Sequence, residues 1–469
     1  MSFSKTVFNS VGLVLLLLSI SPEIAQADLN LAPEIRAKID AAAQEVLSAT
    51  GVPSASLAIV QDGRIVYLQA YGDARLESRV PAKTGMRYSI GSISKQFTAA
   101  AVLMLAEQGK LSLDDPVARF VPDLMRAKEV TIRQVLSHTS GYQDYWPQDY
   151  VPPFMLQPVS ADKILDLWAR KPLDFDPGTQ WQYSNTGYVI AGLIVERASG
   201  TPLLDFLSKH IFEPLKMKSV MNIDQQHLTE TDATGYTRYG LGPLHVAPKE
   251  GQGWLFAAGE LAMPAEDLAK WDISMINQTL LKPASYRDME SSIVLKNGIA
   301  TNYGLGLAVR LDFSRRTLEH GGEVSGFTSA NYVFPDDRAA VVVLTNEDAV
   351  DASDQIANKV APLLFPQEDT TKDEAQARAI FEDFQNGRIS RALFSDNANA
   401  YFSEQALKDL ASGFAPLGAI QSFTQNRRSE RGGMTFRLFK VKFPKQNLQI
   451  WQRTLPDGKI EQYQIMAAE

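Results

Sequence analysis

Residues 88–95 have the sequence Tyr-Ser-Ile-Gly-Ser-Ile-Ser-Lys and lead into a long apolar stretch. The apolar residues of that stretch, within 97–105, recur at helical spacing, and Gly109 follows as a stop signal. Ser92 would therefore stand at the positive end of a helix dipole, where a developing negative charge is stabilised. Lys95 follows one turn later on the same face of the helix.

The Ser92–Lys95 pair is suited to nucleophilic chemistry. A lysine that is buried among apolar neighbours loses its proton more readily and can act as a base toward the serine. The Ser-x-x-Lys pattern alone is weak, because it also occurs at Ser2 and at Ser160. Ser160 is better interpreted as the N-cap of a short helix. From the pair alone, an N-cap with a solvated lysine is an equal alternative for Ser92 and Lys95.

Strand signals lie at both ends of a largely helical region. The dipeptide Asp62-Gly63 between two strand-like runs predicts a hairpin, and a helix at 33–49 precedes it. Residues from about 92 to 300 are mostly helical in pattern. Further strands are expected at 305–311, 317–320, 329–334 and 339–344, followed by a helix at 353–364. This order predicts an α+β fold, with one antiparallel sheet closed by both ends of the domain, flanked by helices, and a helical insertion domain.

A second unit is predicted at the C-terminus, since 469 residues exceed the size of a single core. The polar residues 366–372 are interpreted as a linker, and Thr371 with Glu374 as a capping box for a helix that ends before Gly387. Strand-like runs follow at 421–427, 434–443, 448–455 and 460–466. We therefore expect a main domain over 28–365 and a small α+β domain over 373–469, with a role in assembly or in access to the cleft.

The first residues are typical of a targeting signal. Lys5 precedes an apolar run at 11–20, which is too short to span a bilayer, and Ala25-Gln26-Ala27 fits the small-x-small cleavage rule. We interpret residues 1–27 as a signal peptide and Asp28 as the mature start. The prediction is a periplasmic or secreted protein without a stable membrane span, and a retained N-terminal anchor is the alternative.

Composition excludes several classes of site. The chain has 46 Lys+Arg against 54 Asp+Glu, so there is no basic excess for binding nucleic acid. It has no cysteine, which excludes disulfides, thiolate metal sites and a cysteine nucleophile. The five histidines show no metal-ligand spacing. The expected partner is a small molecule or a short peptide, and the oligomeric state is left open.

Two further motifs contain groups that can transfer or bind protons. Tyr183-Ser184-Asn185 precedes a helix at 189–198. A nearby ammonium would lower the pKa of Tyr183 and let it shuttle protons, and the Asn185 amide could hold a lysine and a substrate amide together. In isolation, a structural tyrosine and a helix-entry asparagine are the favoured interpretation.

The other motif, His320-Gly321-Gly322, is expected to end the strand at 317–320. Two glycines after a strand would let another backbone approach closely. An ordinary turn at the end of a strand is the favoured alternative when this motif is taken alone.

Taken together, the three motifs in this order resemble the serine hydrolases related to class C β-lactamases and D-alanyl-D-alanine carboxypeptidases, the penicillin-binding-protein-like family. The resemblance covers roughly residues 33–365, with support from stretches 136–141, 257–261 and 303–307. It implies a β-lactamase/transpeptidase-like fold with the site between the sheet and the helical domain. It also implies acyl transfer through a covalent serine ester, without a metal or an organic cofactor.

The resemblance implies roles for particular residues. Ser92 corresponds to the nucleophile, Lys95 to its base partner, and Tyr183 to the residue that passes a proton to the leaving group. The implied substrate-binding residues are Asn185, His320, Gly321, Gly322 and Glu323. The backbone N–H groups of Ser92 and Glu323 would form the oxyanion hole. The loop at 138–145, with Tyr142 and Tyr145, is expected to line the cleft or simply to pack.

One departure from the family concerns His320, since class C β-lactamases have Lys-Thr-Gly at this motif. A histidine is mostly uncharged near neutrality, and burial beside Lys95 would lower its pKa further. We therefore expect weak action on penicillins and cephalosporins and better action on small esters or uncharged D-amino-acid amides. The overall prediction is an exported serine hydrolase of peptide amides or esters, and the alternative is a non-catalytic binder of cell-wall peptides or of a protein partner.

Overall fold

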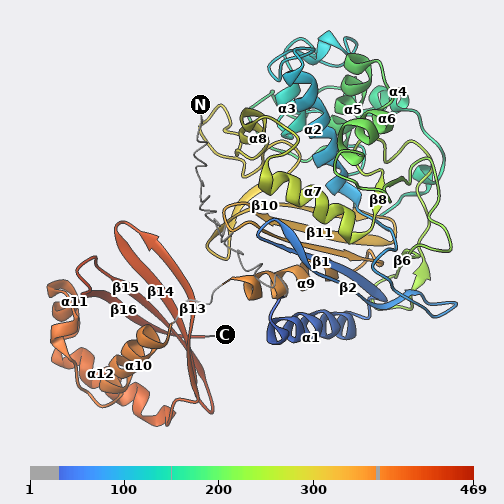
Figure 1. Ribbon diagram of the computed structural model, residues 1–469. Helices are drawn as coiled ribbons and strands as arrows, with labels where there is room; N and C mark the ends of the chain where they lie inside the picture. The colour runs from blue at the N-terminus through green and yellow to red at the C-terminus, as the bar shows by residue number, and fades with distance from the viewer. Residues whose placement is uncertain (1–30, 149, 366–369, 469) are drawn as a thin grey trace, which may run out of the picture.

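The computed structural model describes residues 31–148, 150–365 and 370–468 (Figure 1). The predicted signal peptide and residues 366–369 of the predicted linker lie outside these described residues. Within the described ranges, no helix is both long enough and apolar enough to cross a membrane.

The main domain is organised around a seven-stranded antiparallel sheet with the order β3-β2-β1-β12-β11-β10-β9. Its N-terminal strand β1 pairs with its last strand β12, from Ala55 opposite Thr345 to Val60 opposite Ala340. The prediction that both ends of the domain close the sheet is therefore confirmed. The strands are β1 (Ser54–Gln61), β2 (Arg64–Arg75), β3 (Val80–Pro81), β9 (Ala308–Asp312), β10 (Arg315–Val324), β11 (Phe327–Phe334) and β12 (Ala339–Thr345).

Local sequence explains the first elements. The helix α1 (Pro33–Thr50) has proline in its first turn and ends at Gly51, whose φ of 73° is left-handed. Asp62 and Gly63 both have positive φ, at 51° and 71°, as a two-residue hairpin turn between twisted strands requires. Both the helix and the hairpin match the sequence prediction.

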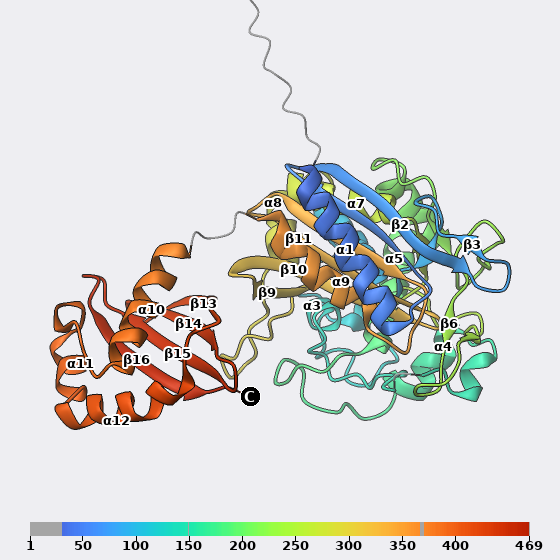
Figure 2. The same cartoon turned by 90° about the horizontal axis from the view of Figure 1, so that it is seen from below.

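Helices cover both faces of the sheet. The helices α1 and α9 (Ala352–Val360) lie together on one face, where they share a hydrophobic core with β1, β11 and β12 (Figure 2). The helix α7 (Ala265–Asn277) packs on the opposite face (Figure 1). The chain leaves one sheet strand, passes through the helical region, and returns to form the other half of the sheet.

The helical region contains two long helices, α2 (Ser94–Glu107) and α5 (Asn185–Ser199), which pack against each other. It also contains long loops and short strands, so it is less helical than the sequence pattern suggests. The short helices are α3 (Ile132–Leu136), α4 (Ala161–Ile164), α6 (Leu203–Leu207) and α8 (Pro283–Met289). The short strands are β4 (Tyr88–Ser89), β5 (Met221–Asn222), β6 (Tyr236–Thr237), β7 (His245–Val246) and β8 (Leu261–Met263).

The prediction that the His320-Gly321-Gly322 motif ends a strand is wrong. The strand β10 continues to Val324, and all three residues pair with β11, from His320 opposite Asn331 to Gly322 opposite Ser329. The glycines still serve a close approach, because a Cβ on Gly322 would lie 2.0 Å from the carbonyl oxygen of Ile90. This contact brings the segment before Ser92 directly against β10.

The C-terminal residues form a four-stranded antiparallel sheet with its own hydrophobic core. The strands are β13 (Ser422–Arg431), β14 (Met434–Lys442), β15 (Asn447–Thr454) and β16 (Ile460–Ala467), and the helices are α10 (Thr371–Gln385), α11 (Asp396–Tyr401) and α12 (Glu404–Phe414). The predicted capping box is not formed. Thr370 rather than Thr371 precedes the helix, and its hydroxyl donates to the Glu374 carboxylate instead of accepting from the backbone.

A buried polar pair joins α7 to the sheet. Asp272 and Asn331 are both fully buried, and the Asn331 Nδ2 donates to Asp272 Oδ1 at 2.9 Å. The remaining oxygens of the pair, Asp272 Oδ2 and Asn331 Oδ1, are buried without a hydrogen-bond partner among the described residues. Burial raises the pKa of Asp272 to about 8, so near neutral pH its carboxyl is largely protonated.

This pair predicts an alkaline loss of stability. Because the folded-state pKa of Asp272 is raised, its contribution is complete below about pH 4 and is lost as the pH rises to about 8. Asp272→Asn, which stays neutral at every pH, should reduce the difference in the free energy of unfolding between pH 6 and pH 9. The measurement is urea unfolding of both proteins at the two pH values. An unchanged difference would show that Asp272 does not titrate in this range.

Candidate active site

Ser92 lies in a 3-10 turn (Gly91–Ile93) that runs directly into α2. Gly91 has a φ of 49°, and a Cβ at this position would lie 2.7 Å from the backbone nitrogen of Glu323. The turn therefore requires glycine for both its conformation and its contact with β10. As a result, the backbone of Glu323 lies beside that of Gly91 and Ser92, where the sequence analysis places the oxyanion hole.

Lys95 has no exposed surface and three hydrogen-bond partners, each at 2.8 Å. They are Ser92 Oγ, Asn185 Oδ1 and the carbonyl oxygen of Ala258. The last two are acceptors only, so they hold two N–H bonds whatever the charge of the amine. If the amine is neutral and both of its N–H groups bond to these two acceptors, the lone pair of Lys95 Nζ faces the third partner, Ser92 Oγ. This is the arrangement that a base needs to take the serine proton.

The environment of Lys95 favours that neutral form. Burial lowers the pKa of Lys95 to about 7, although the nearby Asp144 acts in the opposite direction. A substantial fraction of the amine is therefore unprotonated near neutral pH, as expected for a lysine buried among apolar neighbours.

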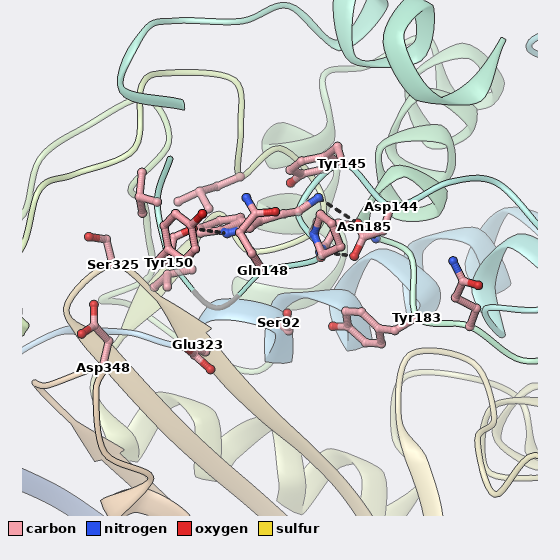
Figure 3. Close-up of a pocket in the computed structure, with 18 residues that line it drawn as sticks. Ser92, Asp144, Tyr145, Gln148, Tyr150, Tyr183, Asn185, Glu323, Ser325 and Asp348 are labelled. Carbon is pink, nitrogen blue, oxygen red and sulfur yellow. Dashed lines mark hydrogen bonds between the residues drawn. The ribbon is translucent and has the colours of Figure 1, made fainter. Parts of the chain in front are cut away.

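Tyr183 lies near Ser92 in the cavity (Figure 3). Its ring centroid is 4.9 Å from Lys95 Nζ, and its hydroxyl is hydrogen-bonded to Ser92. The expectation that the ammonium lowers the pKa of Tyr183 is wrong. Burial raises the pKa well above its ordinary value, and this effect outweighs the hydrogen bond from Ser92. The phenol stays protonated, so it can donate a proton near Ser92 but is not a phenolate base.

Asn185 is the first residue of α5, and its side chain joins the base to an acidic residue. Its Oδ1 accepts from Lys95, while its backbone N–H donates to Asp144 Oδ1 at 2.9 Å and its Nδ2 to Asp144 Oδ2 at 3.4 Å. Burial raises the pKa of Asp144, and backbone N–H groups partly offset this. Asp144 could not be predicted from the sequence, because a single aspartate in a loop has no spacing that marks it.

His320 lies behind the site, with both ring nitrogens occupied. Nδ1 lies 2.5 Å from the carbonyl oxygen of Gly321, and Nε2 lies 2.9 Å from the Tyr303 hydroxyl. Burial and the nearby Lys95 lower the pKa of His320 to about 3, so the ring is neutral. His320, Gly321 and Gly322 do not line the cavity at Ser92, whereas Asn185 and Glu323 do.

The cavity has a volume of about 390 Å³, and Ser92 and Tyr183 are among its lining residues (Figure 3). Three acidic side chains line it, from Asp144, Glu323 and Asp348, and no Lys, Arg or His is among the described residues of its lining. Tyr145 lines the cavity as expected, but Tyr142 is buried and donates to the Met125 carbonyl. The site therefore favours positive charge in its ligand.

The second Ser-x-x-Lys copy within the described residues has the predicted structural role. Ser160 Oγ accepts from the backbone N–H of Lys163 at 3.2 Å and caps α4, and Lys163 is exposed. The two copies thus differ in the burial of the lysine, which sequence spacing alone does not reveal.

Comparison with known proteins identifies the family. The beta-lactamase family model matches residues 39–363, which is more than half of the chain. The chain belongs to the beta-lactamase family. It is 28% identical to penicillin-binding protein 4* of Bacillus subtilis (strain 168), over 66% of this chain and 71% of that protein. It is also 28% identical to a D-aminopeptidase of Brucella anthropi, over 63% of this chain and 56% of that protein.

A solved member of this family has the same fold. The D-amino acid amidase from Ochrobactrum anthropi SV3, complexed with D-phenylalanine, is 25% identical and superimposes with a TM-score of 0.62, over 70% of this chain and 98% of that chain. The beta-lactamase family consists of serine hydrolases, and the antiparallel sheet flanked by helices agrees with the predicted α+β class.

The charge of Asp144, which raises the pKa of Lys95, predicts a change in pH dependence. With a neutral ester as substrate, kcat/KM should fall on the acidic side near pH 7, where Lys95 becomes protonated. Asp144→Asn removes an anion that stabilises the ammonium, so the midpoint should move by about one pH unit to lower pH.

The matched control is Asp348→Asn, which removes an acidic side chain from the same cavity but not from the surroundings of Lys95. Its midpoint should stay at the wild-type pH. An equal shift in both variants, or none in Asp144→Asn, would contradict the assignment.

Proposed function

We propose that this chain is an exported serine hydrolase that cleaves amides of D-amino acids or short peptides with a free amino group. The observation that carries the chemistry is the state of Lys95. Its side chain is fully buried, its pKa is about 7, and its Nζ lies 2.8 Å from Ser92 Oγ. The nucleophile and base of the proposal are therefore Ser92 and Lys95.

The proposed reaction has two stages. Lys95 takes the proton of Ser92, and Ser92 Oγ attacks the carbonyl carbon of the amide while the N–H groups of Ser92 and Glu323 stabilise the oxyanion. Tyr183 donates its proton to the amide nitrogen as the carbon–nitrogen bond breaks, and the amine leaves. Tyr183 then regains a proton from Lys95. Water hydrolyses the resulting ester, releases the acid and restores Ser92.

The charge of the cavity supports a substrate with an ammonium group. The cavity is lined by the acidic side chains of Asp144, Glu323 and Asp348. No basic residue that could bind a carboxylate is among the described lining residues. His320 offers no free N–H, since Nδ1 faces the Gly321 carbonyl and Nε2 faces Tyr303. Two relatives, by their names, act on amino-terminal D-residues or amides of D-amino acids, which agrees with this charge.

Export is proposed on residues 1–27, from their charge, apolar run and small-x-small site. Expression in a bacterium should yield a periplasmic or secreted protein whose intact mass begins at Asp28. A cell-associated protein that retains residues 1–27 would support the anchored alternative.

Labelling of the serine tests the nucleophile. A fluorophosphonate should add to wild-type protein at Ser92, and Ser92→Ala should abolish both the adduct and turnover while the fold is retained. Ser160→Ala is the matched control, because it removes the other described Ser-x-x-Lys serine; it should keep activity and lose about 0.5–2 kcal/mol of stability as a lost helix cap. A folded wild-type protein that no probe acylates would favour the binding-protein alternative.

Substrate charge gives a second test. The protein should prefer D-phenylalanine amide to its N-acetyl derivative, measured as kcat/KM. Asp348→Asn should reduce this preference roughly three- to ten-fold, as for the loss of one partly screened ionic contact. The asparagine oxygen can still accept the Gly326 N–H that Asp348 Oδ2 accepts at 2.7 Å, so the loop should be retained. A preference for the acetylated amide would refute the proposed substrate class.

A further inference from the structure

His138 is a buried residue beside Tyr183 that the proposed reaction does not use. Its side chain is 1% exposed, and its φ of 60° is left-handed, which is unfavourable for a residue other than glycine. Strained conformations persist where surrounding contacts over-determine them, and they cluster at functional sites. The contacts of His138 therefore indicate what the strain serves.

Two of these contacts hold the backbone on either side of Tyr183. The His138 carbonyl accepts the N–H of Gln182 at 3.0 Å, and His138 Nδ1 accepts the N–H of Ser184 at 3.1 Å. The imidazole also packs on the Tyr183 ring, with the centroids 4.3 Å apart and the planes inclined by 33°. One residue thus fixes the chain before Tyr183, the chain after it and the ring itself.

The hydrogen-bond network defines the state of the imidazole. Because Nδ1 accepts from Ser184, a neutral His138 has its proton on Nε2, which lies 3.2 Å from the Tyr303 hydroxyl and donates to it. The His320 Nδ1 faces a carbonyl oxygen and must carry the proton of that ring, so His320 Nε2 accepts from Tyr303 at 2.9 Å. Each hydrogen bond in this chain, from the Ser184 N–H to the Gly321 carbonyl, then has one donor and one acceptor. Both imidazole rings can therefore stay neutral.

We propose that His138 is a positioning residue that holds the Tyr183 hydroxyl against Ser92 for proton donation to the leaving group. The chain through Tyr303 and His320 keeps the His138 ring in the tautomer whose Nδ1 accepts from Ser184. This role rests on the proton donation assigned to Tyr183 in the proposed function. His138 itself touches no reacting atom.

The test compares two substrates that share an acyl group. D-Phenylalanine amide needs a proton on its leaving nitrogen, whereas the 4-nitrophenyl ester of D-phenylalanine has a leaving group that needs none. Tyr183→Phe should therefore lower kcat for the amide about 100-fold or more and the ester much less. His138→Ala should reproduce this pattern with a 10- to 100-fold loss for the amide, as expected for a misplaced proton donor.

A double variant separates positioning from general damage. In the Tyr183→Phe background, His138→Ala should cost less than three-fold in the amide rate, because residues that act as one unit are not additive. Equal losses for amide and ester, or the same loss in both backgrounds, would overturn the proposal. If Tyr183→Phe leaves the amide-to-ester ratio of kcat unchanged, both the proton donation by Tyr183 and the proposal for His138 are overturned. If the ratio changes in Tyr183→Phe but not in His138→Ala, only the role of His138 is overturned.

Two conservative variants keep the test decisive where His138→Ala does not fold. In His138→Asn the side-chain oxygen can take the place of Nδ1 toward Ser184, and asparagine tolerates the left-handed conformation. His138→Gln reaches instead toward the Nε2 position and Tyr303. His138→Asn should retain more of the amide-to-ester ratio than His138→Gln, and the reverse order would overturn the proposal.

Discussion

The site depends on keeping one lysine out of water. An ammonium without exposed surface is costly, and proteins tolerate it only where its donors are fully used or its charge is lost. Lys95 meets both conditions, since it has three partners at 2.8 Å and a pKa of about 7. Each partner comes from a different part of the chain: the turn before α2, the start of α5 and the segment before β8. The packing of α2 on α5 is therefore also the assembly of the base.

The neutral state of the surrounding rings follows from the same constraint. His138 and His320 both have a pKa lowered by burial and by Lys95, so neither adds a second positive charge beside the amine. A lysine in place of His320 would bring a second amine toward Lys95. The histidine instead completes a neutral hydrogen-bonded chain with Tyr303. The acidic residues that line the cavity favour positive charge in the ligand.

The sequence predicted those features that depend on local pattern. The α1 helix, the Asp62-Gly63 hairpin and the cap at Ser160 follow from periodicity and turn chemistry. The closure of the sheet by β1 and β12 follows from the order of the elements along the chain. The course of β10 through His320 was missed, because glycines signal a break unless the approach of another segment requires them; here that segment is at Ile90. The capping box was predicted but is not formed, because the helix begins after Thr370, whose side chain bonds to Glu374 and not to the backbone.

Features set by side-chain contacts between distant segments could not be predicted from the sequence. The ammonium beside Tyr183 suggested a lowered pKa, yet the degree of burial decides the sign, and burial is a property of the whole fold. Asp144 has no motif, and its role emerges only when the loop meets the start of α5. The hydrogen bond from Ser184 to His138, next to Tyr183, likewise joins segments that are more than 40 residues apart.

Asp144 belongs both to the acidic lining of the cavity and to the surroundings of the buried base, Lys95. It lines the cavity, it holds Asn185, and its charge raises the pKa of Lys95 against the effect of burial. An ammonium group of the proposed substrate beside Asp144 would offset that charge. By linkage, the pKa of Lys95 would then fall, and the neutral amine would become more populated when the substrate is bound. A substrate without an amino group lacks this effect, so the same carboxylate that favours an amine in binding also favours it in the activation of Ser92.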